Sequence, residues 1–140
     1  MIMKEDFVSY EIAIKLKEKG FDEPCNMYYH IHNDIADCVG SLEYTRDCSY
    51  DFINSKNKYR CSAPTISQVL KWLRERETRI DIVVYPIDRS TAFIGGEIYT
   101  ISIYIDRERD IEINRNGKDK YRTYEQAALA GIEYVLDNLV

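Results

Sequence analysis

Residues 98–105 alternate between apolar and polar side chains, and this alternation constrains the fold more than any other feature of the sequence. In an extended strand, successive side chains point to opposite faces. Tyr99 and the three isoleucines that follow at every second position would share one face. Thr100, Ser102 and Tyr104 would share the other. The pattern predicts a strand in a sheet that is covered on one face and half open on the other.

Two further runs extend this strand into a sheet. Residues 80–85 are rich in β-branched side chains, and residues 110–114 form a shorter apolar-polar run. The dipeptide Asn116-Gly117 is typical of a tight turn and predicts that residues 118–121 fold back as a hairpin. Together the runs predict a three-stranded antiparallel meander in the second half of the chain.

Three segments predict helices, over residues 9–19, 64–77 and 124–139. The first begins at Ser9, a good N-cap, and ends at Gly20, which suits a left-handed C-terminal cap. The other two each begin with a Thr-x-x-Gln capping box. One box pairs Thr65 with Gln68, and the other pairs Thr123 with Gln126.

The fold predicted for residues 1–140 is a single α+β domain. Its antiparallel sheet comprises the three-stranded meander and an N-terminal strand at residues 25–31, and the helices pack on one face. Residues 33–60 carry weaker signals, with a short apolar piece at residues 41–44. They are predicted to form a variable loop or hairpin, where a chain of this kind would carry its own specificity.

Charge argues against a nucleic-acid partner. The net charge is −5, whereas proteins that bind phosphate backbones usually present Lys and Arg on one face. The one basic stripe, between Arg107 and Arg122, is interrupted by acidic residues that nearly cancel it. Nucleic-acid binding therefore stands as an alternative, supported by the order helix, meander, helix, which is also that of double-stranded-RNA-binding domains.

The sequence also indicates a compartment. It has no stretch typical of a signal peptide or of a membrane span, which predicts a cytoplasmic protein without a membrane partner. Cysteines in that compartment are normally thiols. The four cysteines, at positions 25, 38, 48 and 61, are accordingly predicted to be unpaired.

Two clusters could carry chemistry. His30, His32 and Asp34 would point to one side of an extended strand and could bind a divalent metal, or they could be solvated side chains of an edge strand. Cys61 precedes the helix at Thr65, whose N-terminus could lower the thiol pKa, or it could be a small buried apolar residue. The metal site would make the protein a metal-dependent enzyme.

No established catalytic or phosphate-binding motif occurs in the sequence, which favours binding over catalysis and predicts no cofactor. The chain contains 12 tyrosines, whose apolar ring and polar tip suit partner surfaces as well as half-buried strands. Tyr28, Tyr85 and Tyr104 are predicted to form an interaction surface on the open face of the sheet.

Several short segments resemble a family of small uncharacterised proteins encoded by phages and mobile elements of gut Bacteroidales. The resemblance rests on residues 21–25, 63–65, 72–75 and 123–127. It implies an accessory protein of a phage or mobile element, without implying an activity. The function predicted is a non-catalytic protein-binding module whose partner is a host or phage protein or a second copy of the chain.

Overall fold

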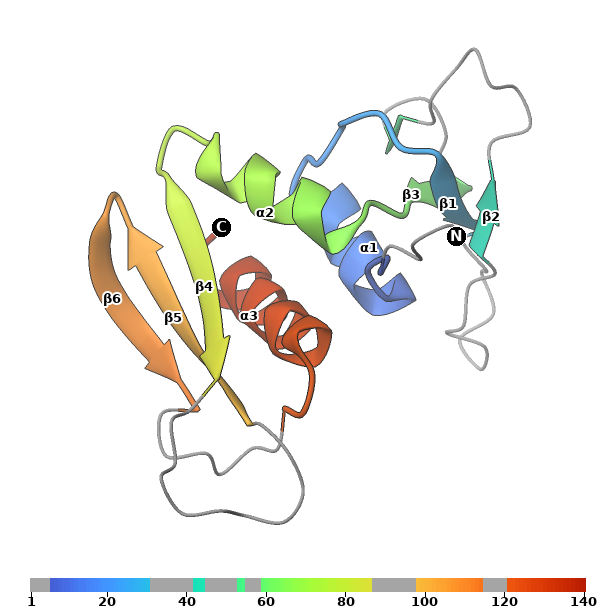
Figure 1. Ribbon diagram of the computed structural model, residues 1–140. Helices are drawn as coiled ribbons and strands as arrows, with labels where there is room; N and C mark the ends of the chain where they lie inside the picture. Colours follow the sequence, from blue (N-terminus) through green and yellow to red (C-terminus); the bar gives the residue numbers. More distant parts are fainter. Residues whose placement is uncertain (1–5, 31–41, 45–52, 55–58, 87–97, 115–120) are drawn as a thin grey trace. The chain divides into compact units, whose positions relative to one another are not determined.

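A computed structural model describes residues 6–30, 42–44, 53–54, 59–86, 98–114 and 121–140 of the chain (Figure 1). It confirms an α+β fold with small antiparallel sheets. The sequence predicts one domain, and the chain divides into two compact units. Unit 1 comprises residues 1–68 with Val140, and unit 2 comprises residues 69–139.

The sheet of unit 1 has three short antiparallel strands. The central strand β1 (Met27–His30) is the predicted N-terminal strand, and it lies between β2 (Leu42–Tyr44) and β3 (Arg60–Ser62). The prediction placed this strand in one sheet with the meander, whereas the structure gives it a sheet of its own. Pairing with two three-residue strands satisfies the main chain of β1 on both sides.

Helix α1 (Tyr10–Glu18) packs against β3, and both of its ends are formed as the sequence predicts. The hydroxyl of Ser9 accepts a hydrogen bond from the Ile12 N–H (3.4 Å). At the other end Gly20 has a φ of 88°, and the Phe21 N–H donates to the Leu16 carbonyl (2.9 Å). Phe21 and Leu16 are both fully buried, which completes a Schellman closure.

Helix α2 (Ile66–Arg74) begins with the predicted capping box. The Gln68 N–H donates to Thr65 Oγ1 (3.2 Å), and the Thr65 N–H donates to Gln68 Oε1 (2.9 Å). The Gln68 amide also donates to the Pro24 carbonyl (3.3 Å). The helix is shorter than predicted at both ends, and the last main-chain hydrogen bond of its C-terminal turn runs from the Glu75 N–H to the Lys71 carbonyl (3.0 Å).

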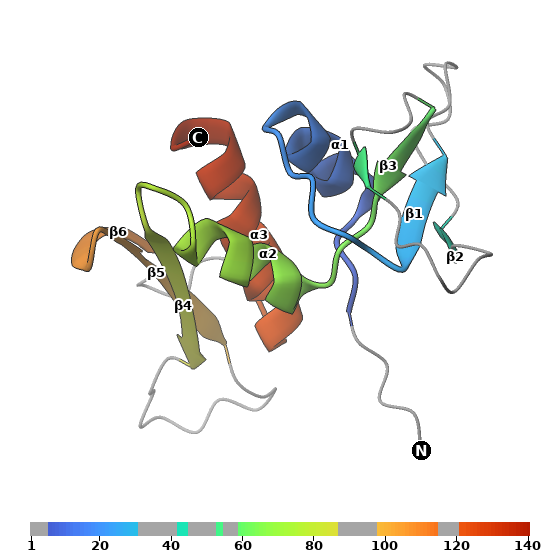
Figure 2. The ribbon, with the colours of Figure 1, turned by 90° about the horizontal axis from the view of Figure 1, so that it is seen from above.

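Unit 2 contains the predicted meander and the last helix. Strands β4 (Ile80–Pro86), β5 (Tyr99–Ile105) and β6 (Glu108–Ile113) pair antiparallel in that order. Helix α3 (Tyr124–Asn138) lies along one face of β4 and β5, as the view in Figure 2 also shows. The predicted turn at Asn116-Gly117 lies outside the described residues.

A glycine allows α3 to lie close to the sheet. A Cβ atom on Gly131 would lie 3.0 Å from Ile82 Cγ2 and 3.1 Å from Ile101 Cγ2. On the sheet Ile101 and Ile103 are fully buried, and on the helix so are Ile132 and Val135. The isoleucine side of the alternating strand is therefore the covered side, as predicted.

None of the helices described by the structure is long and apolar enough to cross a membrane.

Candidate interaction surface

The face of the meander opposite α3 carries the side chains that alternate with the buried isoleucines. Cross-strand partners point to the same face of a sheet, so the register defines its members. Three pairs join β4 and β5, namely Asp81 with Tyr104, Val83 with Ser102, and Tyr85 with Thr100. On β6, Glu112 lies opposite Ser102. These seven residues are called the open face below.

Tyr85 has a defined orientation on the open face. It lies opposite Thr100, yet its hydroxyl is hydrogen-bonded to the hydroxyl of Ser102, two residues along β5 (3.0 Å). The side chain therefore leans across β5 rather than standing upright. Thr100 and Ser102 are 3% and 1% exposed, while Tyr85 itself remains 37% exposed.

Val83 and Tyr85 make the β4 side of the open face apolar. Val83 is 43% exposed, and the two residues belong to the small set of large apolar side chains that are exposed among the described residues. Tyr104 is half-buried. Exposed apolar side chains that are adjacent on a rigid sheet indicate a contact surface more strongly than scattered ones do.

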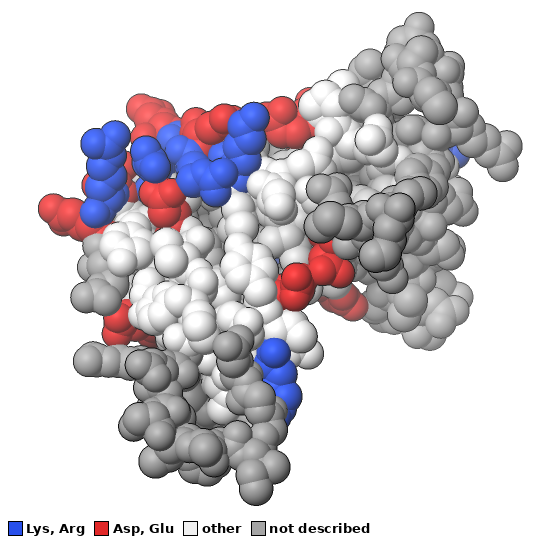
Figure 3. Space-filling model, in the orientation of Figure 1, with Lys and Arg blue, Asp and Glu red and all other residues white. Residues whose placement is uncertain are grey.

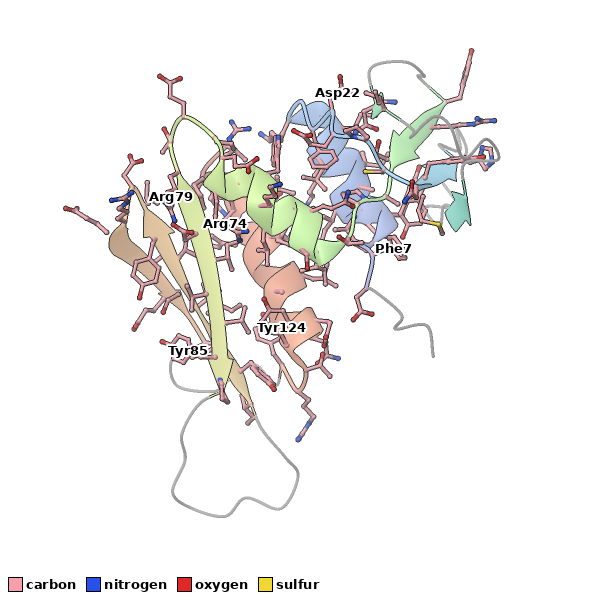
Figure 4. The ribbon with its side chains drawn as sticks, turned by 45° about the horizontal axis from the view of Figure 1, so that its top comes forward. Phe7, Asp22, Arg74, Arg79, Tyr85 and Tyr124 are labelled. Carbon is pink, nitrogen blue, oxygen red and sulfur yellow. The ribbon has the colours of Figure 1, made fainter. Side chains whose placement is uncertain are left out.

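Charged side chains lie at one end of unit 2. Arg79 lies just before β4, and Asp81 is the second residue of that strand. Arg79 Nε donates a hydrogen bond to Asp81 Oδ2 (2.8 Å). Figure 4 places Arg79 and Tyr85 at opposite ends of this strand. Figure 3 shows basic and acidic side chains intermingled over the Arg79 end, and a largely uncharged surface further along β4.

Tyr28, the third tyrosine predicted for the interaction surface, lies elsewhere. It belongs to β1 in unit 1, is 5% exposed, and has the Arg60 guanidinium 4.8 Å from the centroid of its ring. The ring of His30 meets it edge-on, at a centroid distance of 5.5 Å. Its ring is thus buried beneath its neighbours and is not part of the open face.

The predicted metal site is described only in part. His30 is the last residue of β1 and is half-buried, whereas His32 and Asp34 lie outside the described residues. Within the described ranges, no group of three or more His, Cys, Asp or Glu side chains is placed to bind a metal ion.

Cys61 is a structural thiol. It is fully buried in β3, and burial raises its pKa to about 11. The nearby Lys17 ammonium and a hydrogen bond from the Tyr29 main chain lower the pKa by less than burial raises it. Of the two sequence interpretations, the buried apolar residue is therefore confirmed and the activated nucleophile is wrong, because a reactive cysteine needs a lowered pKa and access to solvent.

The other described cysteine, Cys25, is buried too, and both are thiols rather than members of a disulfide, as predicted. Cys38 and Cys48 lie outside the described residues.

Sequence reasoning found Tyr85 and Tyr104 but missed Val83 and Glu112 as members of the same face. The signal was present, since residues 80–85 continue the two-residue period and place Val83 on the side of Asp81 and Tyr85. Because nearly all residues of that run are apolar, the sequence does not distinguish its exposed members from its buried ones. Nothing in the sequence predicts that the Tyr85 side chain leans toward Ser102.

Comparisons of this chain with protein-family models, with curated proteins and with solved structures found no match.

Proposed function

We propose that this protein is a non-catalytic protein-binding module that contacts its partner with the open face of unit 2. The observation that carries the proposal is the exposure of Val83 and Tyr85 side by side on a sheet face whose opposite side is packed against α3. A surface supported by a packed core is already ordered before binding, which lowers the entropic cost of association.

The chemistry of the open face suits a protein partner. Tyrosine supplies a large contact area with few rotatable bonds, and tyrosines are enriched at the centres of protein interfaces. The Tyr85 hydroxyl is already hydrogen-bonded to Ser102, so the ring is held in place before a partner arrives. The resemblance to phage and mobile-element proteins suggests that the partner is a phage or host protein.

Photocrosslinking tests the proposal. The photoreactive residue benzoylphenylalanine is placed at position 83 on the open face and, as a control, at position 71 on the exposed side of α2. We expect a discrete protein adduct from position 83 on irradiation in cells, and none from position 71. Substitution Tyr85→Ser in the position-83 protein should reduce the adduct.

An adduct that forms only from position 71 would place the interface elsewhere. A position-83 adduct that is digested by nuclease would replace the protein partner with a nucleic acid. Absence of any adduct from both positions would contradict the proposed function.

A further inference from the structure

We propose that two copies of this chain associate by pairing their β4 strands antiparallel, edge to edge, with Val83 of one copy opposite Val83 of the other. The pairing joins two three-stranded meanders into one continuous sheet. The inference goes beyond the proposed function, because it assigns a second copy of the chain to the main-chain edge of β4 rather than a partner protein to the open face.

Strand β4 is an edge of the meander that lacks the usual protection. Among the described residues it pairs with β5 alone, and Figure 1 shows it at one side of the sheet. Proteins shield such edges with bulges, charged side chains or short strands. β4 has seven residues, pairs with β5 without a shift in register, and carries one charge, at Asp81. By contrast β6, at the other edge, has a shifted register with β5, and four of its six residues are charged.

The pairing of β4 with β5 determines which main-chain groups face outward. The Asp106 N–H donates to the Arg79 carbonyl (2.8 Å), and these residues lie opposite each other, one step before the first pair of the ladder. Direct bonds between opposite residues alternate along an antiparallel ladder. Every second residue of β4 therefore turns its N–H and C=O away from β5, namely Ile80, Ile82 and Val84. Pro86 continues this series, and a proline is tolerated where its missing N–H would point outward.

An antiparallel copy fits this edge when the two-fold axis passes through Val83. Ile82 then lies opposite Val84 of the second copy, and their outward N–H and C=O groups bond to each other on both sides of the axis. Val83, which is 43% exposed, is covered by its own equivalent. Asp81 lies opposite Tyr85 of the second copy, so the one charge of the strand does not face itself.

The neighbouring registers fit less well. With the axis at Ile82, the exposed Val83 would lie opposite the Asp81 carboxylate of the second copy. With the axis at Val84, the Ile82 carbonyl near the centre of the pairing would lie opposite Pro86, which has no N–H to donate. The axis at Val83 moves that mismatch to the ends of the strand and pairs apolar side chains with apolar ones.

The apolar side chains on the α3 side of β4 gain from the same contact. Ile82 and Val84 are half-buried, whereas Ile101 and Ile103 on the central strand are fully buried. A strand beside β4 would remove the remaining apolar surface of the first two from water. Opposite residues of paired strands point to the same face, so the open faces of the two copies lie on one side of the joined sheet. The dimer therefore presents the proposed binding surface twice.

Disulfide trapping tests the pairing and its register. The substitution Val83→Cys is made in this chain together with Cys38→Ser and Cys48→Ser. Opposite Cα atoms of a non-hydrogen-bonded pair are about 4.5 Å apart, which a disulfide can span. Position 85 faces position 81 of the second copy, so its own equivalent lies about 14 Å along the strand, beyond the reach of a disulfide. We expect mild oxidation to link Val83→Cys into a dimer and to leave the matched control Tyr85→Cys as a monomer.

A mixture of two variants extends the test of register. The Asp81→Cys and Tyr85→Cys proteins should each remain unlinked alone and form a disulfide when they are mixed. Equal yields from Val83→Cys and Tyr85→Cys, or no linked dimer from any of these proteins, would overturn the inference.

Sedimentation equilibrium measures the association without a cross-link. Val83 is exposed, so Val83→Lys and Val83→Glu change the edge without disturbing the core. Each variant alone places like charges opposite each other, and we expect the dissociation constant to rise about fivefold or more. A one-to-one mixture of the two variants places opposite charges there and should recover the loss. A mixture that associates no more tightly than either variant alone would overturn the inference.

Failure of this inference is distinguishable from failure of the proposed function. A photoadduct of position 83 with a protein other than this chain, without a trapped dimer, would retain the binding module and reject the β4 pairing. A trapped dimer without such an adduct would support the pairing and contradict the binding module.

Discussion

Arg79 and Asp106 are joined by two hydrogen bonds that close one end of the meander. The Asp106 N–H donates to the Arg79 carbonyl (2.8 Å), and the Arg79 N–H donates to Asp106 Oδ1 (3.2 Å). Asp106 is also the first residue of the two-residue turn between β5 and β6. The same aspartate therefore ties the start of β4 to the turn that aligns the other two strands.

This turn contains two non-glycine residues with positive φ, 49° at Asp106 and 73° at Arg107. Two-residue hairpin turns with positive φ at both positions favour Asn or Asp followed by Gly. Asp106 fits that preference, whereas Arg107 does not. The backbone at Arg107 is therefore strained by its Cβ atom.

We expect Arg107→Gly to stabilise the protein by about 0.5–1 kcal/mol, because glycine adopts this conformation without the steric cost. Urea unfolding followed by circular dichroism measures the change. Arg107→Ala is the control, since it removes the same charged, exposed side chain but keeps the Cβ atom. Stabilisation of equal size in both variants would show that the charge, and not the backbone, is responsible.

Burial of Cys61 should appear as a loss of stability at alkaline pH. Its pKa is about 11 in the folded protein, against an ordinary value of 9.0. Between these values the unfolded chain has lost the thiol proton and the folded chain retains it, so the free energy of unfolding falls as the pH rises. We expect this fall, measured by urea unfolding at pH 8 and pH 10, to be shallower in Cys61→Ala. An equally steep fall in the variant would contradict a buried, protonated thiol.

The close approach of α3 to the sheet predicts a steric effect at Gly131. Gly131→Val would force a branched side chain against Ile82 and Ile101, and we expect it to destabilise the protein by about 1–3 kcal/mol. Gly131→Ala adds one methyl group, and its better helix propensity offsets part of the contact. The thermal midpoints should therefore rank the alanine variant above the valine variant. The reverse order would indicate that α3 can move away from the sheet.

The parts of the fold that sequence could predict are those fixed by local chemistry. The strand alternation of residues 99–105, the Ser9 cap and the Gly20 closure each depend on a few neighbouring residues, and the structure confirms them. The second sheet could not be predicted in this way. Strands β2 and β3 have three residues each, and tertiary pairing with β1 decides their conformation.

The same distinction between local chemistry and tertiary contacts applies to the candidate surface. The two-residue period placed Tyr104 on the open face of the meander, and the register of β4 with β5 places Tyr85 there as well. Tyr28 could not be assigned in this way, because Met27, Tyr28 and Tyr29 are all buried and this part of β1 shows no alternation of buried and exposed side chains. The turn at Asp106-Arg107 could not be predicted either, because it lacks the glycine that usually marks a two-residue hairpin turn.

Two identical sequence signals form different structures, and this difference gives the last prediction. Gln68 closes the full capping box by accepting from the N–H of its own cap residue, Thr65. Gln126 accepts instead from the Arg122 N–H (2.9 Å), one residue before the cap Thr123. The contact of Gln126 is exposed, whereas that of Gln68 is partly buried and is joined by the bond to Pro24.

We therefore expect Gln68→Ala to destabilise the protein by about 1 kcal/mol and Gln126→Ala by a few tenths, since only the first leaves a partly buried main-chain N–H without its acceptor. Parallel urea titrations of the two variants measure the difference. Thr65→Ala and Thr123→Ala serve as references, because both threonines accept from the N–H three residues later, at 3.2 Å and 3.1 Å, and should cost similar amounts. Equal losses for the two glutamine variants would mean that the bond to Thr65 contributes no more than the exposed one.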